Sequence, residues 1–567
     1  MIRKRKINLE LEKKLVEAGQ SALIARLLAA RNILTEKEVD LKLDLLPHPD
    51  LLKNMREVTA LLADAIIRHK KIVVVGDYDA DGATSCAVAI KSINALGGVV
   101  DFIVPSREKD GYGLSNNLVD RAKAKQADII MTVDNGISSI NSIAYAQDQG
   151  ITVVVTDHHL PGEEVPNCLI VNPNQKDCLF PSKNLAGVGV VFYVMVGVRS
   201  QLEQLNYFDN RQKPNLAQFL DLVALGTVAD VVKLDHVNRI LINHGLQRIR
   251  TKRNCLGIQA LLDVAGKKNK KIQTMDLGFV LGPRINAAGR MEDITTSINC
   301  LLSDDYQEAY EYALQLNTLN QQRRNTEKEM LKITEEDLNS NVQGDQVSIV
   351  KYSENFHQGV IGLVAGKLKE KYHLPTIVFA KGEGDELKGS GRSIAGFHLR
   401  DALALVSRKD PGLILKFGGH AMAAGLSIHI DQLTKFENIF EETVKEMLDP
   451  NLLNKVFLTD GALEVSELNL QVAKQLNQMV WGQDFEEPRF SDHFEVINQK
   501  LVGSQHSHLK AIVRKDNQNF GIMLFNCKDY LPQKVNLVYR LVVNEWGQNE
   551  ELQLYIDYWE KVLDDKT

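Results

Sequence analysis

The chain has 567 residues, of which 44% are hydrophobic and 25% are charged, and its formal net charge at pH 7 is −6. This length predicts about three or four domains with ordinary globular cores, and the negative charge excludes attraction of a polyanion by a global basic field. A nucleic-acid partner would have to be bound by local basic grooves and metal ions.

The cysteines and the apolar segments indicate the compartment. Six cysteines are scattered without a CxxC pair, which argues against a zinc site and a disulfide framework and favours a reducing cytoplasm. The basic start MIRKRKINLELEKK lacks the apolar stretch of a signal peptide. The longest apolar run, residues 185–198, is too short to span a bilayer and contains glycines, so it predicts a buried core helix and no membrane partner.

The region from about residue 70 to residue 235 alternates between two patterns. Stretches of helical composition separate short apolar runs, which we expect to be strands, at residues 72–76, 100–105, 128–133 and 151–156. Continuous apolar strands with helices between them predict an α/β domain with a doubly wound parallel sheet. In such sheets functional groups collect beyond the carboxyl ends of the strands.

The rest of the chain predicts a connector and two further domains. Residues 304–338 lack glycine and proline and are typical of one long, polar helix between domains. A second α/β pattern follows at residues 346–430. The C-terminal region predicts a small β-barrel or sandwich, because it has alternating apolar and polar residues at 508–514, 519–525, 535–546 and 551–559.

Four segments that we expect to follow strands of the first sheet carry acidic or imidazole side chains. Alternate residues of an extended segment face the same side, so the aspartates of GDYDADG could project into one site. Carboxylates with one or two imidazoles suit Mn²⁺ or Mg²⁺, and two such ions about 3.5–4 Å apart suit phosphoester hydrolysis. The segments supply Asp77, Asp79 and Asp81 (GDYDADG), Asp134 (TVDNGIS), Asp157, His158 and His159 (TDHH), and Asp230 (LGTVADVV).

Each of these segments also has an ordinary structural interpretation. A single aspartate after a strand is commonly a helix N-cap or a turn residue, which applies to Asp134 or Asp230 taken alone. GDYDADG could be a calcium loop, although the downstream ligands of an EF-hand are absent. Two adjacent histidines are often incidental. The four segments together nevertheless indicate a metal site at one edge of the sheet.

The same segments resemble a known family. GDYDADG, VDNG, TDHH and GTVAD are similar to the four signatures of the DHH phosphoesterases. SREKDGYGLS, GPRINAAGRM, HQGVIGLVAGKL, GSGRSIAGFHLRDAL and FGGHAMAAGLSI extend the resemblance to the RecJ family of bacterial single-strand-specific exonucleases, over nearly the whole chain. The resemblance implies hydrolysis of single-stranded DNA from a free 5′ end to mononucleotides, with Mn²⁺ or Mg²⁺, in recombination and repair. It also implies a RecQ-type helicase and a single-strand-binding protein as partners.

The resemblance further implies an order of domains. An α/β fold with a doubly wound DHH domain would be joined by the long helix to a second α/β domain, DHHA1, and then to an OB-type barrel. The expected limits are 1–50 for an N-terminal helical segment, 51–303 for the DHH domain, 304–340 for the connecting helix, 341–445 for DHHA1 and 455–567 for the OB fold.

The resemblance assigns roles around the metal site. Asp81 would support the site or orient a ligand through water, His159 would contact the scissile phosphate, and Asp157 would hold a histidine in its tautomer. Several DHH enzymes have a histidine ahead of the first aspartate, where VVVG stands here, so one outer ligand is left open. The implied metal ligands are Asp77, Asp79, Asp134, which would bridge two ions, His158 and Asp230.

Other residues are implied as substrate contacts. Arg107, Ser390 and Arg392 would bind the terminal 5′-phosphate, GSGRS being interpreted as a flexible glycine-rich segment; an exposed turn is the alternative. Arg284 and Arg290 would contact the DNA backbone, or form structural salt bridges instead. His357 and His420 would lie near the substrate, at glycine-rich segments that could serve only close helix packing.

Two other functions stay open at this point. A DHH phosphodiesterase could act on short oligonucleotides or nucleotides, and a non-catalytic relative could hold single strands without cutting them. Such short-substrate enzymes usually stop after the DHHA1 region or carry membrane segments, whereas this chain continues into a β-rich region. A degenerate relative should have lost carboxylates that are all present here.

Overall fold

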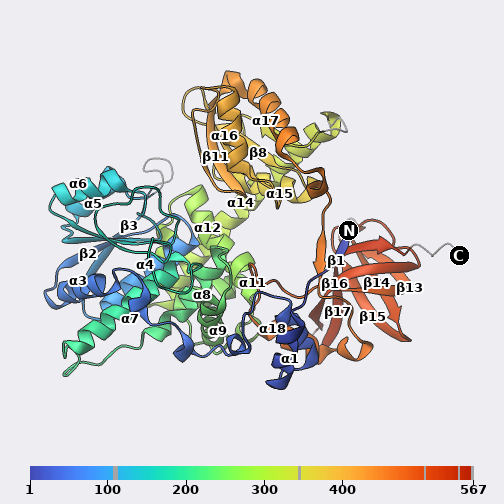
Figure 1. The fold of residues 1–567 in the computed structure, drawn as a ribbon, viewed down its shortest axis with the longest axis horizontal. Coiled ribbons are helices and arrows are strands. Elements are labelled where there is room, and N and C mark those ends of the chain that lie inside the picture. Colours follow the sequence, from blue (N-terminus) through green and yellow to red (C-terminus); the bar gives the residue numbers. More distant parts are fainter. Residues whose placement is uncertain (106–112, 342–345, 504–505, 547–548, 563–567) are drawn as a thin grey trace. The chain divides into compact units, whose positions relative to one another are not determined.

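The structure is a computed structural model that describes residues 1–105, 113–341, 346–503, 506–546 and 549–562. The chain forms two compact units (Figure 1), each described by itself below. One comprises Met1 with Thr318–Val456, and the other comprises Ile2–Asn317 with Phe457–Thr567. Helix α14 (Tyr306–Asn341) begins in the second of these and ends in the first, so the long helix predicted at 304–338 is confirmed.

The larger unit contains a parallel five-stranded sheet in the order β3-β2-β4-β5-β6. Its central strands are buried runs of valine and isoleucine, as expected for a sheet covered on both faces. The register of the sheet pairs Val75 of β2 with Thr132 of β4, and Val133 of β4 with Thr156 of β5. The strands are β2 (Lys71–Val75), β3 (Val99–Ile103), β4 (Ile129–Val133), β5 (Thr152–Thr156) and β6 (Leu169–Val171).

Helices cover both faces of this sheet (Figure 1). One face packs through Val73, Ile130 and Val153 against α5 (Asn116–Ala124) and α6 (Ile140–Asp148). The other face is covered by α3 (Met55–Ile67), α4 (Ala80–Ala95) and α7 (Gly187–Gln204). The doubly wound domain is therefore confirmed. The apolar run at 185–198 is confirmed as a core helix, because it forms most of α7.

Further helices extend this layer beyond the sheet. Helix α8 packs on α4, α7 and α9, and it is buried over nearly its whole length. The described helices of this part are α8 (Leu220–Ala229), α9 (His236–Arg250), α10 (Leu256–Val264), the 3-10 helix η5 (Asn269–Lys271), α11 (Thr274–Asp276), the π-helix η6 (Leu277–Leu281), α12 (Gly282–Met291) and α13 (Thr295–Leu302).

The start of the chain packs against the start of the C-terminal region. Strand β1 (Ile2–Lys4) pairs in parallel with β12 (Phe457–Thr459). Helices α1 (Leu9–Glu17) and α2 (Ala22–Ala29) follow, and the buried guanidinium of Arg31 then forms an ion pair with Asp460 at 2.8 Å. Two chain segments more than 400 residues apart are thus joined by a strand pair and by a buried charge pair, since the sequence separation between Arg31 and Asp460 is 429 residues.

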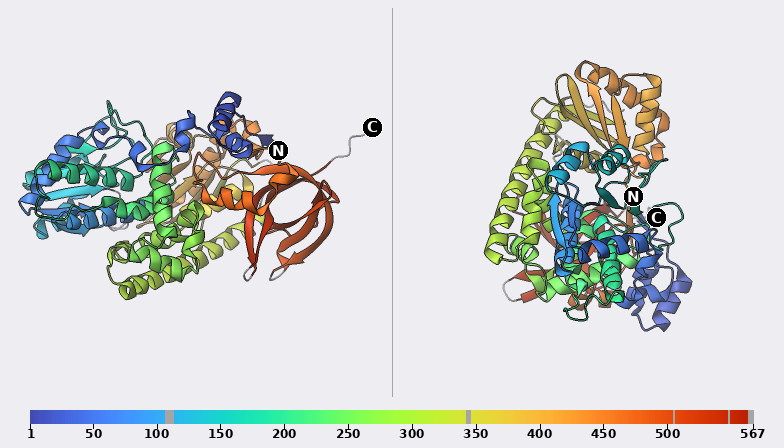
Figure 2. Two further views of the ribbon diagram at one scale, coloured as in Figure 1. Left: turned by 90° about the horizontal axis from the view of Figure 1, so that it is seen from below. Right: turned by 90° about the vertical axis from the view of Figure 1, so that its left-hand side faces the viewer.

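The C-terminal strands form a closed barrel in the order β13-β14-β15-β17-β16, and Figure 2 shows them curving round to close. Alternate residues of β14 are buried, which is the period of a strand with one face toward a core. Helix α18 (Leu470–Gln478) packs on β16 and β17. The strands are β13 (Phe490–Val502), β14 (His508–Lys515), β15 (Gln518–Leu524), β16 (Lys534–Trp546) and β17 (Asn549–Lys561).

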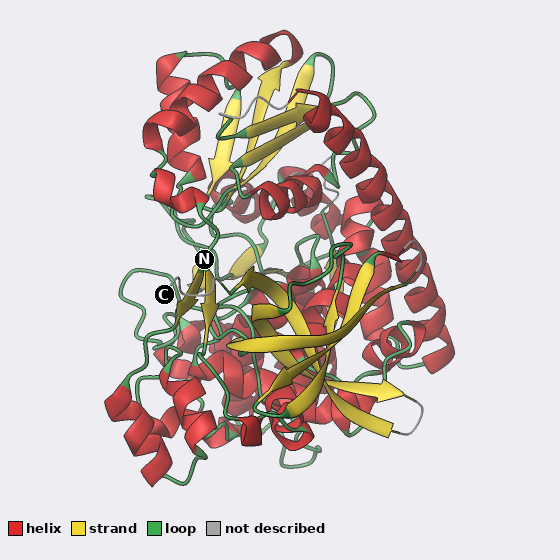
Figure 3. Cartoon of the chain, turned by 90° about the vertical axis from the view of Figure 1, so that its right-hand side faces the viewer, coloured by secondary structure: helices red, strands yellow, loops and turns green. Residues whose placement is uncertain are grey.

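The smaller unit has a mixed sheet in the order β10-β11-β9-β8-β7, with helices on both faces (Figure 3). Helices α16 (Leu399–Lys409) and α17 (Leu433–Met447) build the core on one face, where Phe436 packs on Phe379. Helix α15 (Ile361–Tyr372) packs on β8 and β9. The strands are β7 (Ile349–Tyr352), β8 (Thr376–Lys381), β9 (Glu386–Arg392), β10 (Lys416–Gly419) and β11 (Ala423–His429).

The predicted fold class is therefore confirmed in all its parts: a doubly wound sheet, a long helix, a second α/β domain and a C-terminal barrel. None of the helices in the described part of the chain has both the length and the apolar composition that a membrane crossing requires.

Candidate metal centre

The first acidic segment lies where strand β2 gives way to helix α4. Asp79 is the N-cap residue of this helix, and its carboxylate accepts a hydrogen bond from the backbone N–H of Gly82 at 3.0 Å. Asp81 then lies in the first helical turn. The expectation of one extended segment with three alternating carboxylates was therefore wrong, because an aspartate N-cap starts the helix as early as Ala80.

Asp134 and the two histidines follow neighbouring strands of the same sheet. Asp134 comes directly after β4 and adopts a positive φ of 63°, while its backbone N–H donates to the carbonyl of Thr156 at 2.9 Å. His158 follows β5 by two positions. Because β4 and β5 are adjacent and parallel, their carboxyl ends meet at one edge and bring these side chains together.

Asp230 reaches the site from a helix and not from a strand. It is the C-cap residue of α8, so the prediction of a fourth strand end was wrong. The helix is buried all round, since every residue from Leu220 to Thr227 is buried, including Asp221. A short helix of this kind has no polar face, and periodicity cannot distinguish it from a buried strand.

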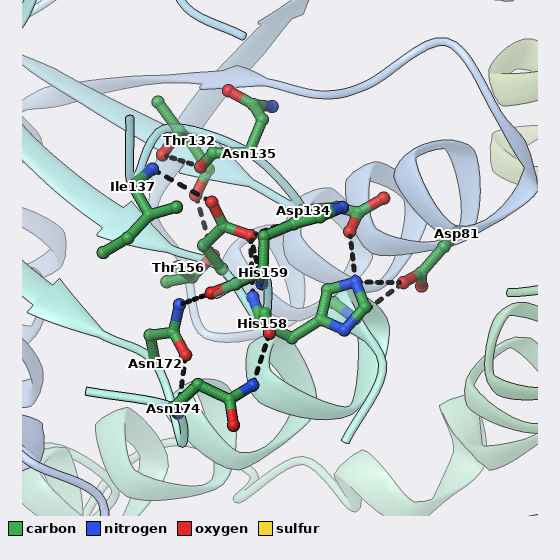
Figure 4. A network of polar contacts seen from close by, with 12 residues as sticks. Asp81, Thr132, Asp134, Asn135, Ile137, Thr156, His158, His159, Asn172 and Asn174 are labelled. Atoms are coloured by element: carbon green, nitrogen blue, oxygen red, sulfur yellow. Dashed lines mark hydrogen bonds and ion pairs between the residues drawn. The ribbon is translucent and has the colours of Figure 1, made fainter. Parts of the chain in front are cut away.

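The side chains of these segments converge on one point (Figure 4). The Nε2 atom of His158 lies 3.2 Å from Oδ1 of Asp134 and 3.9 Å from Oδ2 of Asp81, both labelled in Figure 4. The same Nε2 atom lies 3.5 Å from Oδ2 of Asp230. In the described part of the chain, Nε2 of His158, Oδ1 of Asp134 and Oδ2 of Asp230 are buried without a hydrogen-bond partner. Buried polar atoms that face one another without partners fit a divalent cation bound between them.

The carboxylates of the cluster lie close enough to shift one another's pKa values. Burial and the neighbouring carboxylates raise the pKa of Asp134 and Asp230 well above the ordinary aspartate value, and Asp77 and Asp79 are among the charges responsible. Burial and the charge of Asp79 raise the pKa of Asp81 to about 7. These directions show a cluster of mutually repelling acids, which bound cations would neutralise.

The two histidines differ in their protonation. Burial and the neighbouring His159 lower the pKa of His158 to about 4, so the imidazole of His158 is neutral at pH 7 and suited to bind a metal. Burial alone would lower the pKa of His159, but its hydrogen bond with Asp157 and the charge of Asp157 raise it overall. The Nδ1 atom of His159 lies 2.7 Å from Oδ1 of Asp157.

Asp157 and Asp81 support the site through backbone groups. The carboxylate of Asp157 accepts hydrogen bonds from the N–H groups of His158, His159 and Ile137. The carboxylate of Asp81 accepts the first two N–H groups of α7, at 2.6 Å from Gly187 and 2.9 Å from Val188. Asp81 therefore fastens the N-terminus of α7 to the metal-binding edge of the sheet.

Helix α12 supports the first acidic segment, which sequence reasoning missed. The side-chain oxygen of Asn286 accepts a hydrogen bond from the backbone N–H of Ala80 at 2.7 Å. A Cβ atom at Gly289 would lie 1.9 Å from the carbonyl oxygen of Tyr78, so only glycine allows this approach. The same helix carries Arg284, whose guanidinium donates to Asn317 and to the carbonyl of Val280, and Arg290, which is half-buried.

The smaller unit gathers the predicted Ser390 and Arg392. They lie on strand β9, so the expectation of a flexible glycine segment or an exposed turn was wrong. Gly389 and Gly391 of the same strand face the core, where they pack against Phe379 and Leu399. Arg392 donates to the hydroxyl of Ser390 at 3.2 Å, and a Cβ at Gly362, in the first turn of α15, would lie 2.9 Å from both side chains. Burial lowers the pKa of Arg392.

The remaining predicted substrate contacts of this unit are two exposed histidines, and one further predicted contact lies outside the described residues. His357 is exposed just before α15, and its Nδ1 accepts the N–H of Gly359. His420 is exposed at the turn between β10 and β11. Arg107 lies outside the described residues.

Comparisons with known proteins agree with this geometry. Family models match the chain at residues 71–227 (DHH family, N-terminal domain), 344–446 (DHHA1 domain) and 459–558 (RecJ OB domain). The single-stranded-DNA-specific exonuclease RecJ of Haemophilus influenzae is 43% identical over 556 residues, which cover 95% of this chain and 96% of that protein. The chain belongs to the RecJ family.

Other RecJ proteins support the assignment. RecJ of Escherichia coli is 44% identical over 552 residues, covering 94% of this chain and 95% of that protein. The crystal structure of RecJ in complex with Mn²⁺ from Thermus thermophilus matches with a TM-score of 0.83 at 28% identity, over 99% of this chain and 79% of that chain. A RecJ complex with Mg²⁺ from the same organism matches with a TM-score of 0.77.

Proposed function

We propose that this protein is a 5′-to-3′ exonuclease that hydrolyses single-stranded DNA to mononucleotides in recombination and repair. The observation that carries the proposal is the convergence of Asp134, His158 and Asp230, whose facing atoms are buried without hydrogen-bond partners in the described part of the chain. The close RecJ relatives are named single-stranded-DNA-specific exonucleases, which supports the choice of substrate.

The proposed site binds two divalent ions, Mn²⁺ or Mg²⁺. Two groups of possible ligand atoms share His158: one with Asp134 and His159, the other with Asp81 and Asp230. When bound, such ions supply a water of lowered pKa and positive charge for the phosphoryl oxygens. The proposed ligands are Asp77, Asp79, Asp134 as the bridge, His158 and Asp230.

The chain's own residues orient this chemistry. His158 is neutral at pH 7 because burial lowers its pKa to about 4, so Nε2 offers a lone pair among the carboxylates. Asp157 fixes the ring of His159 through Nδ1 and raises the pKa of His159, so that this histidine carries a proton more readily and suits contact with the scissile phosphate. Asp81 holds the N-terminus of α7 in place beside Asp134, the proposed bridging carboxylate.

A second proposed site, in the smaller unit, binds the terminal 5′-phosphate. Ser390 and Arg392 face the first turn of α15, where backbone N–H groups and the helix dipole favour an anion. A guanidinium that is partly buried keeps a strong electrostatic attraction for a phosphate. Arg107, Arg284, Arg290, His357 and His420 stay predictions as further substrate contacts.

The decisive experiment is digestion of labelled DNA with Mn²⁺. We expect 5′-phosphorylated single strands to be degraded to mononucleotides from the 5′ end, and duplex DNA of the same sequence to remain intact. Single strands that are bound but not cut would contradict the proposal and favour a non-catalytic relative. Faster hydrolysis of dinucleotides than of long strands would favour a short-substrate phosphodiesterase.

Replacement of Arg392 tests the phosphate site. We expect Arg392→Ala to raise KM for 5′-phosphorylated single strands about 10- to 100-fold, because a charge-assisted contact contributes about 1.5–3 kcal/mol. The variant should treat 5′-hydroxyl and 5′-phosphate ends alike. Steady-state kinetics on the two substrates measure both effects.

The matched control is Lys416→Ala, which removes an exposed cation from β10 in the same unit. It should retain the preference for a 5′-phosphate. An unchanged preference in Arg392→Ala would show that the end is recognised elsewhere.

The wider setting follows from the same proposal. The partners would be single-stranded DNA with a free 5′ end, a RecQ-type helicase and a single-strand-binding protein, and the location would be the cytoplasm. Scattered cysteines that form no disulfide among the described residues support a reducing compartment.

A further inference from the structure

The segment after strand β6 lies beside the two histidines at the edge of the sheet. Strand β6 pairs in parallel with β5, so Val171 lies opposite Thr156, and the N–H of Asp157 donates to the carbonyl of Val171 at 3.1 Å. The next residues, Asn172 to Asn174, therefore run alongside the start of the histidine segment. Both asparagines come from a part of the sequence that the proposed metal ligands do not include.

The two asparagine side chains bind the backbone of the histidines (Figure 4). The Nδ2 group of Asn174 donates to the carbonyl of His158 at 2.6 Å, and the Nδ2 group of Asn172 donates to the carbonyl of His159 at 2.9 Å. The asparagines are also joined to each other, because the N–H of Asn174 donates to Oδ1 of Asn172 at 2.7 Å.

These contacts complete the support of an irregular segment. His158 and His159 lie in neither helix nor strand, so no regular ladder fixes their peptide groups. Asp157 accepts hydrogen bonds from the N–H groups of both histidines, while the asparagines donate to the carbonyls of the same residues. The backbone of the pair is thus held from both sides, which limits rotation of the peptide planes that carry the rings.

We propose that Asn172 and Asn174 are positioning residues that set the rings of His158 and His159 for metal binding and for contact with the phosphate. A displacement of about 1 Å at a reacting centre can cost about 10²-fold in rate, and outer partners of metal ligands commonly contribute 10- to 100-fold in affinity or activity. The inference rests on the proposed metal site, but not on the identity of the substrate.

Asn174→Ala is the primary test, because Asn174 is only half-buried and its loss should leave the protein folded. We expect the Kd for Mn²⁺, measured by titration of the full-length metal-free protein, to rise about 10- to 100-fold. In assays on 5′-phosphorylated single strands, kcat at low Mn²⁺ should fall and should recover as Mn²⁺ is raised, while KM for DNA should stay unchanged. A general loss of structure would not be reversed by metal.

Gln175→Ala is the matched control. Gln175 also donates from a side-chain amide to backbone carbonyls, that of Ile170 at 2.9 Å and that of Asn172 at 3.3 Å, but among the described residues it has no hydrogen bond to the histidine carbonyls. We expect Gln175→Ala to keep the wild-type Kd for Mn²⁺ within about threefold. An equal loss in both variants would overturn the proposal, since it would show that any loosening of this segment weakens the metal site.

A second variant and a second measurement guard against misfolding. Asn174→Asp keeps the size of the side chain but removes the donor, so it should weaken Mn²⁺ binding as Asn174→Ala does. Hydrogen exchange of the metal-free protein should be faster in Asn174→Ala than in Gln175→Ala at the amides of residues 157–160. Wild-type exchange and wild-type Mn²⁺ affinity in both Asn174 variants would overturn the inference. If the wild-type protein binds Mn²⁺ but leaves DNA uncut, only the proposed function fails.

Discussion

Asp134→Asn is expected to lower kcat on single-stranded DNA by on the order of 10³-fold, because it removes charge stabilisation worth several kcal/mol at the proposed bridging position. The substitution keeps the shape of the side chain, whose Oδ1 lies 3.2 Å from Nε2 of His158. Binding of single strands should persist. Single-turnover digestion at saturating Mn²⁺, together with a DNA-binding titration, measures the two effects separately.

The same substitution should stabilise the metal-free protein. Asp134 has a pKa raised by burial and by neighbouring carboxylates, so its charged form destabilises the fold when no cation is present. A raised folded-state pKa means that stability is lost as pH rises, and the gain from Asp134→Asn should therefore be larger at pH 8 than at pH 6. A gain of about 1 kcal/mol corresponds to a Tm increase of about 1 °C in a unit of this size, measurable by thermal unfolding in EDTA.

Asp221→Asn provides the control for the kinetic result. Asp221 is a buried aspartate in the same unit, on α8, with a pKa that burial raises, and it accepts a hydrogen bond from the N–H of Cys255. This variant should retain wild-type kcat, because Asp221 lies outside the converging cluster. Activity in Asp134→Asn within about tenfold of wild type would refute the bridging role.

Gly187→Ala is expected to disable the site through a single added methyl group. A Cβ at position 187 would lie 2.6 Å from both Cβ and Oδ1 of Asp134, so either α7 or the carboxylate must move. A shift of about 1 Å at the proposed bridging ligand should cost about 10²-fold in kcat, and overpacking should cost about 1–3 kcal/mol of stability. Kinetics and thermal unfolding of the metal-loaded protein measure these changes.

Gly189→Ala places the same methyl group two residues along α7. The three atoms nearest to its Cβ all belong to the side chain of Leu185, the closest at 3.2 Å, and none belongs to Asp134. This variant should be close to wild type in kcat. If Gly187→Ala binds Mn²⁺ and cuts DNA as the wild type does, the close packing of α7 on Asp134 is not needed for the function of the site.

Much of the architecture could be predicted from local patterns. The strands β2, β4 and β5 are rich in Val and Ile. The carboxyl ends of such strands in a parallel sheet share an edge, so Asp134 and His158 could be expected to meet. The barrel strands β14 and β15 have the alternation of a half-buried strand. These signals are short-range, and periodicity detects them directly.

The errors arose where burial removes periodicity. Asp230 was assigned to a strand end because α8 has no polar face, and β9 was interpreted as a flexible segment because its inward-facing residues include Gly389 and Gly391. Both elements are defined by what packs around them, which a single sequence does not display. Glycine in β9 serves close packing against Phe379 and Leu399 and does not mark a loop.

The supporting residues could not have been found from spacing alone. Asn286 binds the N–H of Ala80 from 206 positions away, and nothing in GPRINAAGRM distinguishes that asparagine from a surface residue. Asn172 and Asn174 offered a weak signal, since NPN directly follows a short apolar run. Hydrogen bonds from side chains to distant backbone groups depend on the tertiary fold. Sequence patterns therefore indicate the proposed metal ligands but not the residues that position those ligands.

The join between the two ends of the chain has a consequence for synthesis on the ribosome. The ribosome adds 429 further residues after Arg31 before it reaches Asp460. At translation rates of about 5–20 residues per second, this takes roughly 20 to 90 s. During that interval β1 has no strand to pair with, and a guanidinium destined for the interior stays hydrated. The nascent N-terminus is therefore held open until the last fifth of the polypeptide emerges, and it docks as one of the final steps of folding.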